Sequence, residues 1–162
     1  MLNVEKIFIL HYTKLTQRKE RLDAYLKRHD IKAEYILDYD QEDLTPEVIS
    51  EWYNNDPDKY HETIDDCYKQ FAVPFRSLNL AEISCTIKHY LGIKSIAEQC
   101  NDYGLILEDD VIFVEDFEKH FNNFLEETPD DWGAIFMGCC ANLRVPESQL
   151  KDGQNAYHMK HP

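Results

Sequence analysis

The chain has 162 residues, a formal net charge of −14 at pH 7 and an apolar fraction of 43 %. That length fits a single domain, and that composition is typical of a folded globular protein rather than a disordered one. A surface this acidic repels phosphate backbones, so nucleic acid is excluded as an expected partner.

No stretch approaches the roughly 20 consecutive apolar residues of a membrane span. The apolar run at residues 7–10 is too short for the core of a signal peptide. We therefore expect a soluble cytoplasmic protein without an integral membrane segment.

The five cysteines are odd in number and include no Cys-x-x-Cys pair. This pattern argues against a closed disulfide framework and against a structural zinc site. Free and mostly buried thiols in a reducing compartment are expected. The cysteines are Cys67, Cys85, Cys100, Cys139 and Cys140.

The first 37 residues predict a βαβ unit. Residues 6–10 (K-I-F-I-L) form a continuous apolar run, typical of a strand that is covered on both faces. Residues 13–29 carry a helical apolar stripe, and residues 33–37 indicate a second strand. Strand, helix and strand in this order favour an α/β fold.

The acidic segment from residue 38 to 66 predicts short surface helices joined by loops. Pro46 after Thr45 is a typical helix start. Residues 79–100 then give the clearest helix, because Asn79 and Glu82 have the spacing of a capping box. Its broad apolar surface indicates a helix that packs against a sheet.

The C-terminal part predicts further alternation. Residues 105–107 form a strand, residues 116–125 a helix and residues 132–137 another strand, while Tyr157 and Met159 indicate the start of one more. The chain is therefore expected to form one α/β domain, with a mostly parallel (mixed) sheet flanked by helices.

Three adjacent acids, Glu108, Asp109 and Asp110, follow the predicted strand at residues 105–107. Carboxylates clustered at the end of a buried strand repel one another and lose hydration, so they need a partner. Mg²⁺ and Mn²⁺ suit carboxylate oxygens, and ligands bind at the carboxyl ends of strands in α/β sheets. The alternative is that the acids cap the following turn or neutralise nearby bases.

Two other protein classes place acids after an apolar strand. Receiver domains need a phosphoacceptor Asp after a later strand, but the next apolar strand here ends in Gly138-Cys139. Haloacid-dehalogenase-type phosphatases need Asp in the first acidic position, where this chain has Glu108. Both classes are disfavoured.

Three blocks together resemble glycosyltransferase family 25, which includes lipooligosaccharide and collagen galactosyltransferases. Residues 7–10 with 18–22 (R-K-E-R-L) are similar to the family's opening strand and Arg-rich helix. Residues 80–89 (L-A-E-I-S-C-T-I-K-H) resemble its Glu-Ile-Gly-Cys-x-x-Ser-His helix, and residues 105–111 (L-I-L-E-D-D-V) its acidic motif. Residues 132–138 resemble the strand that follows.

The chain departs from the family pattern at several positions. His11-Tyr12 stands where the family usually has Asn-Leu, Ser84 replaces a Gly and Lys88 replaces a Ser. Relatives continue past Pro162. Residues 1–162 are therefore expected to be a single nucleotide-sugar-binding domain that lacks the C-terminal part of the family domain.

The resemblance implies a Rossmann-like domain of the GT-A type and an inverting transfer of a hexose, galactose or glucose, from a UDP-sugar. The acceptor would be a hydroxyl group on a glycan, a lipooligosaccharide or other lipid-linked glycan, or a protein. Glu108 and Asp110 would hold Mn²⁺ or Mg²⁺ as the cofactor. Inversion requires a general base, which is not assigned; Glu115 and Asp116 are nearby, but both can simply start a helix.

Seven further residues are predicted to contact the nucleotide-sugar. For each of them a structural role, as a turn residue, a packed side chain or part of a solvated helix face, remains open. Asp40 follows the same strand as Asp38 and shares its interpretation. The seven are His11, Tyr12, Arg18, Asp38, Lys88, His89 and Asp109. The alternative function is a non-catalytic module that binds a nucleotide-sugar or a basic partner.

Overall fold

The computed structural model describes residues 2–53, 77–137 and 151. The chain divides into two compact units, Val4–Val111 and a unit that joins Met1–Asn3 to Ile112–Pro162. Each unit is described separately below. Among the described residues, no helix has the length and hydropathy that crossing a membrane requires.

The larger unit is built on a three-stranded parallel sheet. Its strands are β1 (Ile7–Leu10), β2 (Glu34–Ile36) and β3 (Leu105–Glu108), in the order β2-β1-β3. In the central strand, Ile9 pairs with Tyr35 on one side and with Leu107 on the other. All four residues of β1 are buried, which confirms the prediction of a strand covered on both faces.

Helix α1 (Thr16–Arg28) connects β1 to β2 and begins three residues later than predicted. Residues 12–15 instead form a turn, in which the Leu15 N–H donates to the Tyr12 carbonyl at 2.9 Å. Leu22 and Leu26 of the predicted apolar stripe are buried. Their burial confirms that α1 presents this face to the core.

Helix α4 (Leu80–Gln99) covers the sheet, and its bounds match the predicted helix closely. The predicted capping box is present: the Asn79 side chain accepts from the Glu82 N–H, and the Glu82 carboxylate accepts from the Asn79 N–H. Gly92 allows the close approach, because a Cβ there would lie 3.1 Å from Cδ1 of Ile106 in β3. The interface between α4 and the sheet contains Phe8, Leu10, Ile36, Leu91, Ile96 and Ile106.

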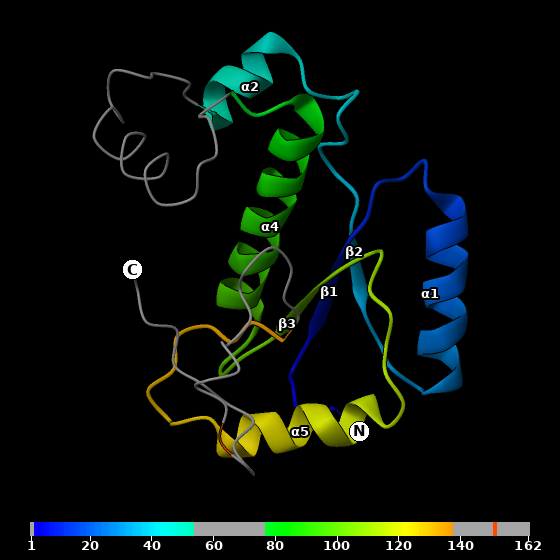
Figure 1. Ribbon diagram of the computed structural model, residues 1–162. Helices are drawn as coiled ribbons and strands as arrows, with labels where there is room; N and C mark the ends of the chain where they lie inside the picture. The colour runs from blue at the N-terminus through cyan, green and yellow to red at the C-terminus, as the bar shows by residue number, and fades with distance from the viewer. Residues whose placement is uncertain (1, 54–76, 138–150, 152–162) are drawn as a thin grey trace. The chain divides into compact units, whose positions relative to one another are not determined.

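The sheet lies between two helices. Figure 1 shows α4 on one side of the strands and α1 on the other. The chain passes from β1 to β2 on one side and then, through α4, to β3 on the opposite side of β1. The carboxyl ends of β1 and β3 therefore flank the point where the strand order reverses, which is where open α/β sheets bind ligands.

Helix α2 (Pro46–Trp52) packs beside the N-terminal half of α4. Thr45 caps it by accepting a hydrogen bond from the Val48 N–H, as the sequence predicts. Trp52 contacts Tyr90 of α4 edge to face, with ring centroids 5.3 Å apart. This packing fixes the loop that leads from β2 toward the site.

The smaller unit contains α5 (Phe117–Glu127). Phe121 is buried, and the Phe117 ring lies between Phe113 and Phe121 at centroid distances of 4.8 and 5.7 Å. The prediction of a strand at residues 132–137 is wrong, because these residues pair with no strand in the described part of the chain and Phe136 is 68 % exposed. An apolar run becomes a strand only where an edge is available to pair with it.

Two predictions concern residues outside those that the structure describes: the strand near Tyr157 and Met159, and three of the cysteines. Of the other two cysteines, Cys85 is exposed and Cys100 is partly exposed, and both are free thiols. The expectation of buried thiols is therefore wrong for Cys85.

Candidate functional site

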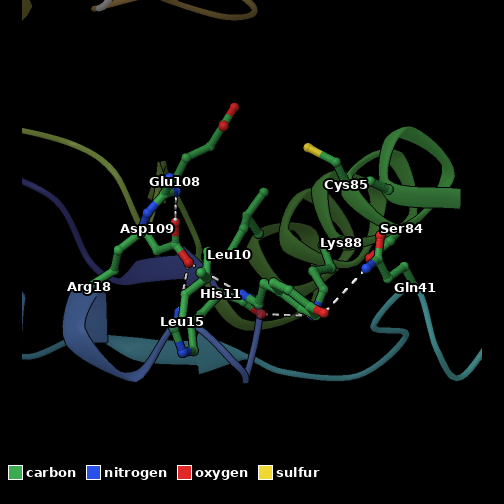
Figure 2. Close-up of a pocket in the computed structure, with 12 residues that line it drawn as sticks. Leu10, His11, Leu15, Arg18, Gln41, Ser84, Cys85, Lys88, Glu108 and Asp109 are labelled. Carbon is green, nitrogen blue, oxygen red and sulfur yellow. Dashed lines mark hydrogen bonds and ion pairs between the residues drawn. The ribbon is translucent and has the colours of Figure 1, made fainter. Parts of the chain in front are cut away.

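A pocket of about 210 Å³ opens at the carboxyl ends of β1 and β3. Figure 2 shows its walls: the ends of the two strands, the start of α1 and one face of α4. The residues that line it are Leu10, His11, Tyr12, Leu15, Arg18, Gln41, Ala81, Ser84, Cys85, Lys88, Glu108 and Asp109. The pocket thus lies where the sheet topology predicts a ligand.

Asp109 ties the loop after β3 to the loop after β1. Its Oδ2 accepts from His11 Nδ1 at 2.7 Å and from the Tyr12 N–H at 3.3 Å, while its Oδ1 accepts from Arg18 Nη1 at 2.8 Å. Burial alone raises the pKa of Asp109, but the hydrogen bonds from Arg18, His11 and Tyr12 outweigh it and lower the pKa below its ordinary value. Asp109 is therefore an ionised anchor whose oxygens are committed to the protein.

Arg21 holds the same loop from α1. Its Nη2 donates to the backbone carbonyls of Asp109 and Val111 at 3.3 and 3.4 Å. Together, Arg18 and Arg21 fix the position of the acidic segment, so the Arg-rich start of α1 has a definite structural role.

Lys88 is buried, and its ammonium group bridges the ends of two strands. It donates to the backbone carbonyls of His11 at 2.8 Å and Leu37 at 3.0 Å, and to Asp40 Oδ1 at 2.8 Å. These contacts use all three N–H donors of an ammonium group. Lys88 thus has a structural role in the pocket wall, and its ammonium group has no further N–H donor for a ligand.

Asp40 is the buried partner of Lys88. Its Oδ2 also accepts from the backbone N–H and the hydroxyl group of Thr13. Burial raises the pKa of Asp40, but the hydrogen bonds from Lys88 and Thr13 dominate and lower it. The pair is 5 % and 6 % exposed at the side chains, so neither charge can be removed without leaving the other unpaired in the interior.

His11 is almost fully buried. Since the ionised Asp109 can only accept, His11 Nδ1 donates to it. Nε2 has no hydrogen-bond partner among the described residues, and the ring packs edge to face on Tyr35. His11 is therefore a buried part of the pocket wall, fixed by Asp109 and Tyr35.

Tyr12 lies at the outer part of the pocket. Its hydroxyl donates to Glu42 Oε1 at 2.5 Å, and Lys14 Nζ lies 2.7 Å from the same oxygen. The hydrogen bonds from Lys14 and Tyr12 lower the pKa of Glu42 to about 2. These contacts fix the hydroxyl end of the Tyr12 side chain.

The outer two acids of the cluster face solvent. Glu108 and Asp110 have side chains that are 55 % and 59 % exposed. Glu108 Oε1 lies 3.2 Å from Nε2 of His89, and Asp110 Oδ2 lies 3.6 Å from Nη1 of Arg18. Unlike the carboxylate of Asp109, these two keep oxygens accessible to a cation.

The structure brings together most of the predicted site residues. Six of the nine line the pocket; among the other three, His89 contacts Glu108 and Asp110 pairs with Arg18. Asp38 is exposed and is not part of the pocket lining. The six that line the pocket are His11, Tyr12, Arg18, Lys88, Glu108 and Asp109.

Sequence reasoning missed several lining residues. Ser84 could have been found from its position four residues before Lys88, since residues at that spacing share a helix face. Its hydroxyl donates to the Tyr39 carbonyl at 2.6 Å, so it too holds the loop after β2. Gln41 gives no local signal, because a polar residue in an acidic loop looks like any solvated one.

These features define an α/β protein with a ligand site at the switch point of a parallel sheet and an accessible acidic pair at its opening. The sequence model described as glycosyltransferase family 25 (LPS biosynthesis protein) matches residues 4–150. The chain belongs to glycosyltransferase family 25.

Curated relatives agree with this assignment. The chain is 23 % identical to a glycosyltransferase 25 family member of Drosophila melanogaster over 97 % of its own length and 24 % of that protein. It is 23 % identical to procollagen galactosyltransferase 2 of Mus musculus and 22 % identical to procollagen galactosyltransferase 1 of Danio rerio, each over 83 % of this chain. The matches cover 20 % and 21 % of those two proteins, so the chain spans only about a fifth to a quarter of these relatives.

Proposed function

We propose that the chain forms the donor-binding part of a metal-dependent, inverting glycosyltransferase of the GT-A type. The donor is a UDP-hexose, with galactose favoured over glucose because two of the relatives are named galactosyltransferases. The acceptor is a hydroxyl group on a glycan, a lipid-linked glycan or a protein. The observation that carries the proposal is the pocket at the switch point of a family 25 chain, with Glu108 and Asp110 exposed beside it.

The size of the pocket supports binding of part of a nucleotide-sugar. A volume of about 210 Å³ lies below the roughly 300–1,000 Å³ of sites that enclose a whole drug-sized ligand. It suits part of the donor, such as the ribose with the first phosphate, and the remainder of the donor would extend past the opening. In this proposal Tyr12 stacks on the base, and the five N–H donors of Arg18 allow it to contact a phosphate while it holds Asp109.

The acidic residues fit a hard divalent cation. Glu108 and Asp110 would supply carboxylate oxygens to Mn²⁺ or Mg²⁺, which suit such ligands. A bound cation would neutralise the charge that builds on a diphosphate leaving group. Asp109 does not fit the role of a ligand, because both of its oxygens already accept hydrogen bonds from the protein.

The proposal is tested by thermal unfolding with and without Mn²⁺, crossed with a panel of UDP- and GDP-sugars. A ligand at about 100 times its dissociation constant stabilises a fold by roughly 2.7 kcal/mol, which raises the melting temperature of a chain this size by about 5–10 °C. We expect a shift that requires both Mn²⁺ and one UDP-sugar.

Two variants make this test specific to the site. The shift should be lost in Asp110→Ala and kept in Asp130→Ala, which removes an equal charge from an exposed position in the smaller unit. Absence of a shift with every donor would contradict the proposal and favour the alternative of a non-catalytic module that binds a basic partner. A shift that survives Asp110→Ala would contradict the assigned metal ligand.

A further inference from the structure

Three side chains that bind soft or borderline metals meet at the edge of the pocket. Cys85 and His89 lie four residues apart on α4, so they occupy the same helix face, and Glu108 ends β3. The Cys85 Sγ, a ring nitrogen of His89 and a carboxylate oxygen of Glu108 all lie within 4.8 Å of one another. Figure 2 shows the Cys85 thiol and the Glu108 carboxylate on the same side of the pocket, from α4 and from the end of β3.

The distances suit a tetrahedral zinc ion after small side-chain rotations. Bond lengths of about 2.3 Å to sulfur and about 2.0–2.2 Å to nitrogen or oxygen place tetrahedral ligand atoms about 3.4–3.6 Å apart. His89 Nε2 and Glu108 Oε1 are already 3.2 Å apart. The thiol therefore needs to approach the other two ligand atoms by at most about 1.3 Å, which rotation of an exposed cysteine side chain allows.

The charge around the thiol also favours a cation. The carboxylates of Glu108, Asp110 and Asp109 lie near enough to Cys85 to act on it electrostatically, and Lys88 is the cation that opposes them. The same carboxylates attract a divalent ion to this edge of the pocket. A protein site with three ligands keeps a fourth position open, as catalytic zinc sites do.

We propose that Cys85, His89 and Glu108 form a binding site for Zn²⁺ or a similar thiophilic divalent cation, with one coordination position open toward the pocket. This site differs in ligand chemistry from the hard-cation site at Glu108 and Asp110, because thiolate and imidazole ligands select zinc over magnesium or manganese. It shares only Glu108 with that site. The sequence gives no local spacing pattern for this site, because its ligands come from α4 and from the end of β3.

The test uses Co²⁺ as a spectroscopic substitute for zinc, in the absence of any nucleotide-sugar. A variant in which Cys67, Cys100, Cys139 and Cys140 are all replaced by Ser keeps Cys85 as its sole thiol. Titration of this variant with Co²⁺ should produce a thiolate-to-cobalt charge-transfer band that saturates at one equivalent and disappears when Zn²⁺ is added. The full chain should give the same band.

Further variants assign the ligands. In the full chain, Cys85→Ser should abolish the band and Cys100→Ser, a matched change at the other described thiol, should keep it. His89→Gln and Glu108→Gln should each weaken Zn²⁺ binding at least tenfold, since even outer-shell substitutions cost about 10–100-fold in metal affinity. No band in the sole-thiol variant, or a band that persists in Cys85→Ser, would overturn the proposal.

A second measurement does not depend on any variant at the ligands. In the sole-thiol chain, Zn²⁺ should slow alkylation of Cys85 by iodoacetamide, because a metal-bound sulfur reacts poorly. An unchanged alkylation rate at saturating Zn²⁺ would also overturn the proposal. No nucleotide-sugar is present in either measurement. Zinc binding can therefore be confirmed even if UDP-sugar binding is not observed, and UDP-sugar binding can be confirmed even if zinc binding is not.

Discussion

Replacing Lys88 with Met tests whether this residue is a structural clamp or a ligand contact. Methionine keeps an unbranched side chain of similar length but removes the ammonium group. The change deletes the hydrogen bonds to the carbonyls of His11 and Leu37 and leaves Asp40 with only the donors of Thr13. Removing one partner of a buried ion pair costs about 3–5 kcal/mol, because the other charge stays unpaired in the interior.

That loss is a large part of the total free energy of unfolding of the domain. A natural domain is stable by about 5–15 kcal/mol, so Lys88→Met should be close to unfolding or markedly weakened. Lys94→Met is the matched control, because Lys94 lies on the same helix with its side chain 52 % exposed and only a 3.8 Å contact to Glu98. Exposed helical pairs contribute about 0.3–0.5 kcal/mol, so the control should stay near the parent chain.

Urea unfolding followed by far-ultraviolet circular dichroism measures both variants at pH 7. In the Lys88→Met background, Asp40→Asn removes the unpaired charge and should recover a substantial part of the lost free energy of unfolding. The reasoning is refuted if Lys88→Met costs less than about 1 kcal/mol, or if the second change recovers nothing. A stable Lys88→Met chain that has lost donor binding would instead support a direct ligand contact.

Three other changes give separate tests. Because the pKa of Asp109 lies below its ordinary 3.8 in the folded chain, its contribution to stability is full above that value and is lost as the pH falls through the lowered pKa. The urea midpoint should therefore fall less between about pH 5 and pH 3 in Asp109→Asn than in the parent chain; equal slopes would contradict this. Asn79→Ala should lower the free energy of unfolding by about 1 kcal/mol through loss of the capping box, and an unchanged midpoint would show that the cap does not matter. Gly104→Ala should lower the free energy of unfolding by about 1–3 kcal/mol, because the added Cβ would lie 2.8 Å from Ile96 Cγ1. Gly133→Ala is the control, because a Cβ there meets nothing within 4 Å, and its melting temperature should not fall. Equal melting temperatures for the two variants would contradict this reasoning.

The sequence predicts the elements whose signals are local. The strand β1 and the helix α4 follow from a continuous apolar run and from a capping box, and both are confirmed within one residue. The strand expected at residues 132–137 fails because an apolar run alone does not provide a pairing partner. The parallel topology was predictable from the alternation of strands and helices, since parallel neighbours need a crossover.

The acidic cluster at residues 108–110 shows a feature that the local sequence does not predict, the different exposure of its three side chains. Glu108, Asp109 and Asp110 look equivalent in sequence, but the structure turns the middle one inward, to His11 and Arg18, and leaves the outer two exposed. Glu108 is the last residue of β3, and Asp109 and Asp110 lie in the turn that follows it. Strand alternation therefore does not extend across the cluster, and the sequence does not predict which acid faces the interior.

The sequence by itself therefore determined the family, the order of most elements and the location of the acidic segment, because periodicity, caps and motifs are encoded within a few residues of one another. Only the tertiary structure decided the roles of individual side chains. Lys88 meets Asp40 across 48 residues, and Arg18 meets Asp109 across 91. Pairs so far apart leave no local pattern, since their contact depends on how the strands and helices pack rather than on the spacing of the residues.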